Sequence, residues 1–278
     1  MSNEPLVSVL MTAYNRQAFI AEAISSVLSS TYQNWELIVV DDASNDNTSS
    51  IVKGFSENDS RIKLYVNDFN LGDYPNRNRA ASYANGRYLK YVDSDDTIYP
   101  EAIENMVKEM EQYPSAEWGL GSLVHEITEP LCLSYQAVYE FHYFNKPIFF
   151  APPGLAIISK KAFDAVGGFS IQRMVSDFDM WHKLSAYSPV VLIPGKVVSI
   201  REHPQQEVKA QKDYVVEYEK IKLRWLSLEC SPLSKDQVKR IKTNRRNTAF
   251  KIALKKLVKL DLKGAIPRIK VCWFYLWN

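Results

Sequence analysis

The chain contains little cysteine, and the few cysteines are scattered. Only Cys132, Cys230 and Cys272 occur among 278 residues. Their number is odd, and no two of them form a CxxC pair. This usage argues against a disulfide framework and against a zinc cluster, and it favours a reducing compartment.

Long apolar runs and a secretion signal are also absent. No apolar stretch is long enough to span a bilayer, and the segment from Met1 to Pro5 lacks a basic region followed by an apolar core. The sequence has neither a glycine-rich dinucleotide fingerprint nor a Walker A loop. With 46% hydrophobic and 24% charged residues, the composition is that of a globular chain, which we expect to be cytoplasmic.

Charge is distributed unevenly along the chain. Residues 1–206 contain 16 Lys or Arg and 25 Asp or Glu, a balance of −9, whereas residues 207–278 contain 18 and 7, a balance of +11. An acidic body followed by a basic tail predicts two parts with different partners. We therefore expect one domain over residues 1–206 and a basic helical region over residues 207–278.

The first third of the chain alternates between strand and helix patterns. The sequence predicts strands over residues 6–11, 35–40, 62–66 and 88–92, and helices over residues 18–29, 48–55 and 76–84. Further helices are expected over residues 160–166 and 177–186, and a last strand over residues 190–194, whereas residues 114–153 are harder to assign. Buried strands that alternate with helices predict an α/β fold with a mostly parallel central sheet and flanking helices.

Polar residues follow three of the predicted strands. They are Thr12-Ala13-Tyr14-Asn15, Asp41-Asp42, and Asp93-Ser94-Asp95-Asp96. Ligands of parallel α/β sheets bind beyond the carboxyl ends of the strands, so these residues should converge on one crevice.

The acidic quartet, Asp93 to Asp96, is the most informative of these segments. Crowding three carboxylates costs free energy unless a cation relieves the repulsion. Hard oxygen ligands suit Mg²⁺ or Mn²⁺, ions that often also hold substrate phosphates. A solvated turn is the plain alternative, but the position after a strand favours a metal-assisted phosphate site.

The other polar segments have structural interpretations beside the functional ones. Asp41-Asp42 could cap the following helix, accept hydrogen bonds from a base or ribose, or divide these roles. Tyr14 suits base stacking, or it simply covers the crevice. Acidic residues such as Asp177 and Asp179 are common in the first turn of a helix for dipole reasons alone. A lone histidine such as His203 is usually structural.

Several motifs, taken in order, resemble the inverting family 2 glycosyltransferases of GT-A fold. The matching segments are residues 7–16, 37–48, Asn70-Leu71-Gly72 with Arg77-Asn78, 88–96, 154–169 ending in Gly-Gly-Phe, and 177–184. The resemblance covers residues 5–206, and the order of several motifs makes it specific. It implies a Rossmann-like GT-A domain followed by a C-terminal helical appendage.

The resemblance also implies roles for individual residues. It assigns nucleotide binding to Thr12, Ala13, Tyr14, Asn15, Asp42, Arg77, Asp93 and Asp95. It assigns a Mn²⁺ or Mg²⁺ ion to Asp95, Asp96 and His203. Asp177 matches the general base, with Asp179 close enough to compete for that role. Ser176 replaces the glutamate that usually precedes the base, so an electrostatic partner of the base is lost.

The implied reaction is transfer of a sugar, with inversion, from a nucleoside diphosphate sugar to an acceptor hydroxyl. The resemblance favours a UDP-sugar donor, a saccharide or lipid-linked saccharide acceptor, and bacterial cell-surface polysaccharide synthesis. One alternative is a nucleotidyltransferase that makes sugar nucleotides, which would show a glycine-rich basic loop after the first strand. Another is a non-catalytic module that binds nucleotide sugars.

The basic tail allows two interpretations. Either it packs as helices and leaves a solvated basic face, or it lies on the inner face of the plasma membrane. The second interpretation rests on a mixture typical of interfacial helices, namely Ile266, Ile269, Val271, Trp273, Phe274, Leu276 and Trp277 with Lys263, Arg268 and Lys270. No recognition motif for nucleic acid accompanies the charge. Ser234 and Gln237 fit a capping box, which predicts that a helix begins there.

Overall fold

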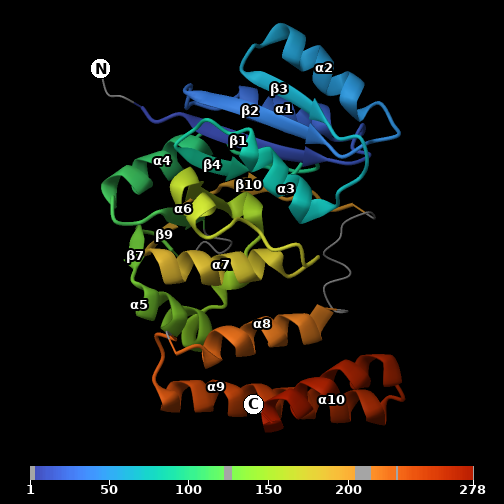
Figure 1. The fold of residues 1–278 in the computed structure, drawn as a ribbon, viewed down its shortest axis with the longest axis vertical. Helices are drawn as coiled ribbons and strands as arrows, with labels where there is room; N and C mark the ends of the chain where they lie inside the picture. The colour runs from blue at the N-terminus through green and yellow to red at the C-terminus, as the bar shows by residue number, and fades with distance from the viewer. Residues whose placement is uncertain (1–3, 122–126, 204–213, 230, 278) are drawn as a thin grey trace. The chain divides into compact units, whose positions relative to one another are not determined.

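The computed structural model describes residues 4–121, 127–203, 214–229 and 231–277 (Figure 1). The chain divides into two compact units. The first comprises Met1–Val138 with Phe150–Glu202, and the second comprises Tyr139–Phe149 with His203–Asn278. The second unit thus takes in an internal segment, residues 139–149, that the charge pattern does not mark.

An eight-stranded sheet forms the centre of the first unit, in the order β3-β2-β1-β4-β8-β6-β9-β7. Its strands are β1 (Val7–Ala13), β2 (Trp35–Asp41), β3 (Ile62–Val66), β4 (Tyr88–Tyr91), β6 (Trp118–Gly121), β7 (Leu131–Leu133), β8 (Ala156–Ser159) and β9 (Val190–Ile193). Strands β1 to β4 are mutually parallel, and β8 and β7 run antiparallel to their neighbours. The prediction of a mostly parallel sheet is confirmed.

The sequence explains why β1 and β2 lie at the centre of this sheet. Nearly all of their residues are buried, as expected for apolar runs covered on both faces. Thr12 lies opposite Val40 and Ala13 lies opposite Asp41, so the carboxyl ends of the two strands are level. A second, antiparallel sheet pairs β5 (Thr97–Ile98) with β10 (Val198–Ser199).

Helices flank the sheet of the first unit (Figure 1). They are α1 (Ile20–Leu28), α2 (Thr48–Asn58), α3 (Asp73–Ser82), α4 (Ala102–Gln112), α6 (Lys160–Ala165) and α7 (Ser176–Tyr187). Short helical turns occur at η2 (Ile148–Phe150) and η3 (Pro153–Leu155), and α5 (Tyr135–Glu140) leads into the π-helix η1 (Phe141–Asn145). The sequence predicted most of these helices, but α4 was not predicted.

Helix α3 begins three residues earlier than the sequence pattern indicates. The residue before it, Gly72, has a φ of 87°, a conformation that glycine adopts without strain. Asp73 then lies in the first turn and pairs with Arg77 one turn later, with Nε and Oδ1 2.8 Å apart. The missed turn contains Pro75, which a first helical turn tolerates because its missing N–H would have no partner there.

The second unit is built from α8 (Val215–Ser227), α9 (Lys235–Val258) and α10 (Leu262–Trp277), with residues 139–149. Leu223, Ala249, Val271 and Tyr275 form its buried cluster. The predicted capping box at the start of α9 is confirmed. Ser234 N donates to Gln237 Oε1 at 2.8 Å, and Gln237 N donates to Ser234 Oγ at 3.2 Å.

A buried group of polar side chains joins the three helices of this unit. Glu219 of α8 accepts hydrogen bonds from Lys222, from Arg245 of α9 and from the Tyr275 hydroxyl of α10. Burial raises the pKa of this carboxyl, but the two cations and the hydrogen bonds outweigh burial and the net shift is downward. The C-terminal helix therefore belongs to the core of the unit.

The residues of α10 that suggested an interfacial helix differ in their exposure. Ile266, Ile269 and Trp273 are exposed, as that interpretation requires. Val271 is buried, and Phe274 is partly buried against the cluster around it, so these two side chains belong to the core of the unit. The side chains of Leu276 and Trp277 lie outside the described residues. Among the residues that the structure describes, no helix combines the length and apolarity needed to cross a bilayer.

Candidate active site

The loops that follow β1 and β2 are held in a strained conformation. Asn15 and Ala43 have φ values of 53° and 60°, in the left-handed region that non-glycine residues rarely adopt. Asn15 N donates to Ser44 Oγ at 2.8 Å, and Asn45 N donates to Asn15 Oδ1 at 2.9 Å. Such strain persists only where the surroundings enforce it, and it clusters at functional sites. The ends of the two strands therefore form one fixed rim.

The nucleotide-binding residues predicted at the end of β1 lie on this rim. Ala13 is buried, and its carbonyl accepts a hydrogen bond from Asp42 N at 2.8 Å. Thr12 is partly buried beside it. The Tyr14 side chain is 42% exposed, so the face of its ring is accessible for stacking.

The two aspartates at the end of β2 accept hydrogen bonds from different loops. Asp41 accepts hydrogen bonds from Ser44 N at 3.2 Å and from Ser49 Oγ at 2.5 Å, and it thereby fixes the turn into α2. Asp41 does not cap α2, however, because the N-cap residue is Asn47 and no side chain caps that helix, so the predicted capping role was wrong.

Asp42 instead holds the loop that leads into α3. Its Oδ1 accepts from Asn67 Nδ2 at 2.6 Å and from Leu71 N at 2.8 Å, and its Oδ2 accepts from Gly72 N at 2.9 Å. The carboxylate is buried and fixes the loop before α3 through these contacts. Its predicted contact with a base or ribose stays a prediction.

Asp93, the first residue of the quartet, is paired with Arg77 of α3. Arg77 NH2 lies 2.6 Å from Asp93 Oδ1, while Arg77 Nε bonds Asp73. Burial opposes the charged guanidinium, but the carboxylates of Asp73 and Asp93 outweigh burial and raise the pKa of Arg77. The arginine is therefore a fixed, buried positive charge between α3 and the end of β4.

Asp95 is paired with a residue that the sequence left without a role. Arg16 Nε donates to Asp95 Oδ2 at 3.1 Å, and Arg16 NH1 donates to Tyr14 O at 3.0 Å. Arg16 thus connects the end of β1 to the quartet. Its place directly after the polar end of β1 was the available signal.

Asp96 shows the charge crowding expected for the quartet. Burial raises the pKa of its carboxyl to about 7, and Asp93 and Asp95 add to the rise, while a hydrogen bond from Arg201 N at 2.9 Å opposes it. A divalent cation here would relieve the repulsion between the carboxylates.

The donor set fits a metal that is held jointly by protein and substrate. Within the described residues, no group of three or more His, Cys, Asp or Glu side chains is arranged to hold an ion. Mg²⁺ commonly takes only one or two carboxylates and completes its shell with water and phosphate oxygens, so Asp95 and Asp96 would suffice. His203 belongs to the second unit, and its role as a ligand stays a prediction.

A fully buried lysine lies beneath the quartet. Lys90 of β4 donates from Nζ to Tyr91 O at 2.7 Å and also to Gly154 O. Burial lowers its pKa to about 7, and Asp93 and Asp96 oppose that shift. Lys90 ties the end of β4 to η3. The sequence concealed this role because Lys90 sits within a run of apolar residues that indicated only a buried strand.

Asp177, the predicted base, lies in the first turn of α7. Its Oδ1 accepts from Phe178 N at 2.7 Å. Burial raises its pKa to about 7, and Asp73 adds to this, whereas Phe178 N, Arg77 and a hydrogen bond from Tyr74 oppose it. The carboxyl therefore titrates near neutral pH, as a general base requires. Asp179 is buried in the same turn.

The segment before α7 is anchored to α3. Asn78 Nδ2 donates to Phe169 O at 2.8 Å, and Phe169 N donates to Asn78 Oδ1 at 2.9 Å. Gly168 has a φ of 64°, and a Cβ there would lie 2.8 Å from Asn78 Oδ1. This close approach explains the glycine before Phe169.

Ser176, which stands where a glutamate was expected, fixes the same segment. Its Oγ donates to Ser170 O at 2.6 Å and lies 3.0 Å from Ser170 Oγ. The first turn of α7 thus gains a hydrogen bond at the position where a second carboxylate would have added charge beside the base.

One basic side chain links the strand ends to the start of α7. Arg77 bonds Asp93 at the end of β4, and its charge also acts on Asp177 at the start of α7. Thus the ends of β1, β2 and β4 meet α3 and α7 around a shared set of charges.

Comparison with known families agrees with this geometry. Residues 8–167, more than half of the chain, match the model of the family described as glycosyl transferase family 2. The chain belongs to the family 2 glycosyltransferases.

Relatives of known name are similar over parts of the chain. The UDP-Glc:alpha-D-GlcNAc-diphosphoundecaprenol beta-1,3-glucosyltransferase WfgD of Escherichia coli is 47% identical over 105 residues, which are 38% of this chain and 41% of WfgD. Glycosyltransferase GlyG of Streptococcus pneumoniae serotype 4 is 27% identical over 215 residues, 71% of this chain and 69% of GlyG. The chain spans about two fifths of the length of WfgD.

Solved structures share the fold. S. aureus TarS 1-349 in complex with UDP-GlcNAc superposes with a TM-score of 0.75 at 18% identity, over 97% of this chain and 80% of the TarS 1-349 chain. The mannosyltransferase PcManGT from Pyrobaculum calidifontis, in complex with GDP-Man and Mn²⁺, gives a TM-score of 0.65 at 17% identity, over 99% of this chain and 88% of PcManGT. The first unit is a GT-A fold.

Proposed function

We infer that this protein transfers a sugar from a nucleoside diphosphate sugar, with UDP as the favoured nucleotide, to an acceptor hydroxyl with inversion. The main support is the position of Arg77, which joins the carboxylates at the strand ends to the neighbourhood of Asp177. That arrangement brings a diphosphate-binding rim and a base that titrates near neutral pH into one crevice. TarS and WfgD, whose names or complexes include UDP-sugars, favour the same donor class.

The rim is built to receive the donor. Thr12, Tyr14 and Asn15 offer a partly exposed ring and short polar side chains at the end of β1, where a base and ribose would lie. Arg77 supplies positive charge beside Asp93 for the diphosphate. Bound at Asp95 and Asp96, a divalent ion would supply charge for the departing diphosphate.

Asp177 activates the acceptor. Its carboxylate removes the proton of the acceptor hydroxyl as that oxygen attacks the anomeric carbon from the face opposite the leaving diphosphate. One displacement of this kind inverts the anomeric configuration. Asp73 and burial keep the base poised, because they raise its pKa toward the working pH.

Bacterial polysaccharide assembly is the proposed setting. WfgD is named for an acceptor carried on diphosphoundecaprenol, and the putative Bacillus subtilis glycosyltransferase TuaG is named for teichuronic acid biosynthesis. A saccharide, free or lipid-linked, is accordingly the proposed acceptor.

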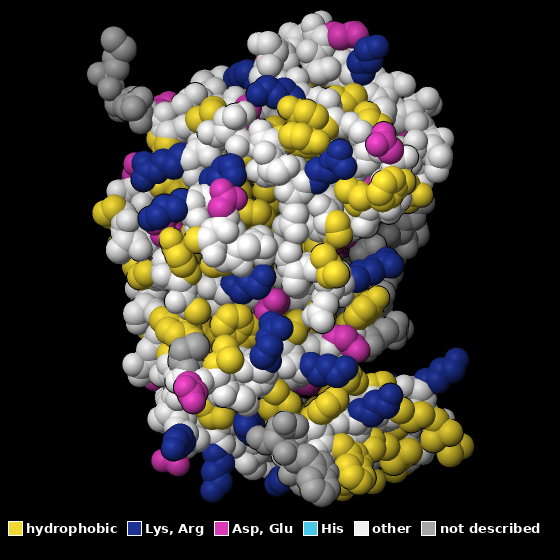
Figure 2. All heavy atoms as spheres, in the orientation of Figure 1, with side chains coloured by type: hydrophobic (Ala, Val, Ile, Leu, Met, Phe, Trp, Pro, Cys, Tyr) yellow, Lys and Arg dark blue, Asp and Glu magenta, His cyan; other side chains and the backbone are white. Residues whose placement is uncertain are grey.

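The second unit provides a surface for peripheral membrane contact. Figure 2 shows hydrophobic side chains gathered where α9 meets α10, with Lys and Arg around them. The exposed apolar residues of this region are Phe250, Leu254, Leu257, Val258, Leu260, Leu262, Ile266, Ile269 and Trp273. Residues 235–278 contain 13 Lys or Arg and two Asp or Glu. Apolar side chains set among cations are typical of helices that lie on anionic membranes.

Vesicle co-sedimentation tests this contact. Phe250→Ser with Leu254→Ser should weaken binding to anionic vesicles, because two exposed apolar side chains are lost. Phe69→Ser with Ile171→Ser is the matched control, since both residues are exposed in the first unit. Equal binding by both variants and the unchanged protein would remove the membrane proposal.

Mass spectrometry of the products separates the candidate functions. A panel of UDP-sugars with Mn²⁺ and a saccharide acceptor should yield a glycosylated acceptor and UDP. A nucleotidyltransferase would release pyrophosphate from a nucleoside triphosphate and a sugar phosphate, and a binding module would yield no product. Asp177→Asn should abolish transfer while donor binding, read as a thermal shift, remains.

A further inference from the structure

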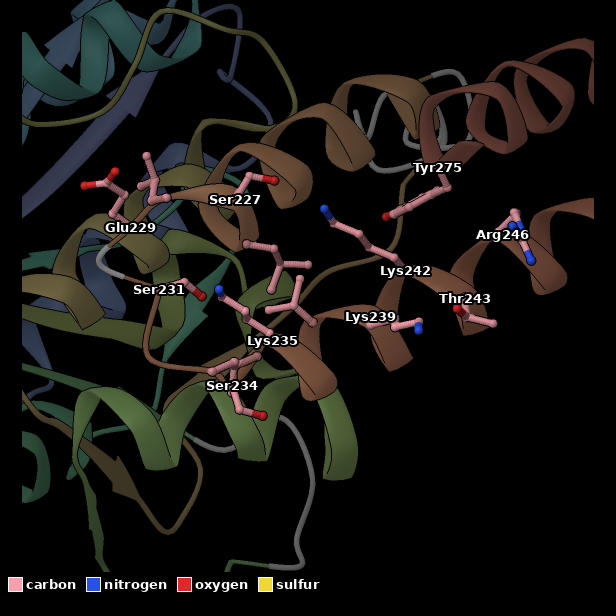
Figure 3. Close-up of a pocket in the computed structure, with 14 residues that line it drawn as sticks. Ser227, Glu229, Ser231, Ser234, Lys235, Lys239, Lys242, Thr243, Arg246 and Tyr275 are labelled. Carbon is pink, nitrogen blue, oxygen red and sulfur yellow. The ribbon is translucent and has the colours of Figure 1, made fainter. Parts of the chain in front are cut away.

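The second unit contains a hollow that the proposed reaction does not use. It has a volume of about 740 Å³, within the range of small-molecule sites, and it lies between the end of α8, the segment after it and the first half of α9 (Figure 3). Its lining includes the apolar side chains of Leu226, Leu233 and Val238. Leu226 and Leu233 are buried, so they form a firm floor.

Four cations of α9 line this hollow. They are Lys235, Lys239, Lys242 and Arg246. Their spacings of four, three and four residues place them on one face of the helix. Like charges at such spacings repel and destabilise a helix unless an anion compensates them.

The carboxylates that the structure describes do not provide that compensation for Lys235 and Lys239. Glu219 is buried and already shared by Lys222, Arg245 and Tyr275. In the described part of the chain, Lys235 and Lys239 have no carboxylate within ion-pair distance. Glu229 is the one acidic residue among the lining side chains that the structure describes.

Hydroxyl groups face the cations from other elements. Ser227 ends α8, and Ser231 lies in the segment after it. In Figure 3, Lys235 and Lys242 extend from α9 toward the segment that bears Ser227 and Ser231. Ammonium groups that share a hollow with hydroxyl donors match an oxyanion with several acceptor oxygens.

We propose that this hollow binds the phosphate or diphosphate group of a larger ligand. Lys235, Lys239 and Lys242 hold the oxygens, and the apolar floor receives the group attached to them. The face of α9 that carries the cations continues, at the same helical spacing, into the exposed apolar residues Phe250, Leu254 and Leu257. Cations followed by apolar side chains favour a phosphate carried on a lipid over a free phosphate.

Calorimetric titration with inorganic pyrophosphate tests the site on the full chain. Lys235→Gln with Lys239→Gln should weaken affinity at least about ten-fold, because hydrogen bonds to charged groups are lost. The control is Lys251→Gln with Lys255→Gln, which removes the same charge at the same spacing from exposed positions of α9 outside the hollow. That variant should change affinity less than about two-fold, since it alters only screened long-range charge.

Phosphatidylcholine vesicles with and without phosphatidic acid identify the source of the phosphate. Sedimentation that requires phosphatidic acid, and that pyrophosphate reverses, assigns the site to a lipid head group. Pyrophosphate binding without sedimentation assigns it to a soluble phosphate. No pyrophosphate binding by the unchanged protein, or equal losses in the two double variants, would overturn the site. Donor turnover, which depends on the first unit, is measured separately and does not decide this question.

Discussion

At the scale of single residues, Asp177 shows how reactivity and stability oppose each other. Burial keeps its carboxyl protonated to about pH 7, compared with an ordinary pKa of 3.8. A group with a raised acid pKa destabilises the fold once the unfolded chain ionises and the folded chain does not. The penalty begins near pH 4 and is complete above pH 7. The protein tolerates this cost at the position where a base is needed.

Replacing the base with its neutral isostere should therefore stabilise the fold. We expect Asp177→Asn to raise the free energy of unfolding by about 1–3 kcal/mol at pH 8. Below about pH 3 the gain should disappear, because the carboxyl is then protonated in both the folded and the unfolded chain. Denaturant unfolding at the two pH values measures the effect. A variant less stable than the unchanged protein at pH 8 would contradict the burial argument.

The same pKa predicts the pH dependence of catalysis. Because the base must be deprotonated, kcat/KM should fall below about pH 7. This acidic limb of the pH profile reports the pKa of the base in the free protein. The pH profile of donor turnover checks it. Asp179→Asn provides the matched comparison, since Asp179 lies in the same turn, and it should retain the limb. If the Asp179→Asn variant instead lost the fall in kcat/KM, Asp179 and not Asp177 would be the base.

At the scale of elements, the approach of α3 to the segment before α7 positions Asp177, the proposed base. Asn78 bonds both backbone groups of Phe169, and Ser176 bonds Ser170, so the first turn of α7 is fixed from two sides. Neither contact shows in local periodicity. The glycine pair at 167–168 permits the approach, because both residues have positive φ.

The two glycines offer a matched test of this junction. Gly168→Ala should destabilise the protein by about 1–3 kcal/mol more than Gly167→Ala. Both substitutions impose a left-handed backbone on alanine, but only position 168 places the Cβ 2.8 Å from Asn78 Oδ1. Position 167 has nothing within 4 Å. Thermal or denaturant unfolding compares them, and equal losses would show that the contact with Asn78 is unimportant.

Local patterns predict much of the N-terminal half and less of the C-terminal half. Strand β3 and the buried runs of β1, β2 and β4 follow from continuous apolar residues. Strands β5 and β10 are two residues each and exist only through pairing across about one hundred residues, so no local signal marks them. The roles of Lys90 and Arg16 were not predicted for a related reason, because their partners come from distant segments.

At the scale of the molecule, the two units differ in charge and in what their surfaces offer. The acidic body contains the charged strand ends, and the basic tail contains the hollow and the exposed apolar face. The tail is also a folded unit, since Val271 and Tyr275 of α10 belong to its core. Removing the last helix therefore tests folding before it tests membrane contact.

Truncation before α10 should disrupt the second unit as a whole. Loss of Tyr275 leaves Glu219 without one of its buried partners, and loss of Val271 opens the cluster around Leu223. We expect amide protection of α8 and α9 to fall to that of an unfolded chain, while the sheet of the first unit keeps its protection. Hydrogen exchange measures both in one sample. Preserved protection in α8 would show that α10 is dispensable for folding.

The central claim is that Asp177 acts as the base for transfer from a donor held at the strand ends. The most direct measurement is mass spectrometry of an acceptor incubated with a UDP-sugar panel and Mn²⁺, for the unchanged protein and for Asp177→Asn in parallel. We predict that one donor adds a single sugar in the unchanged protein, and that the variant adds none although the same donor still raises its thermal stability. Equal transfer by the two proteins would contradict the claim.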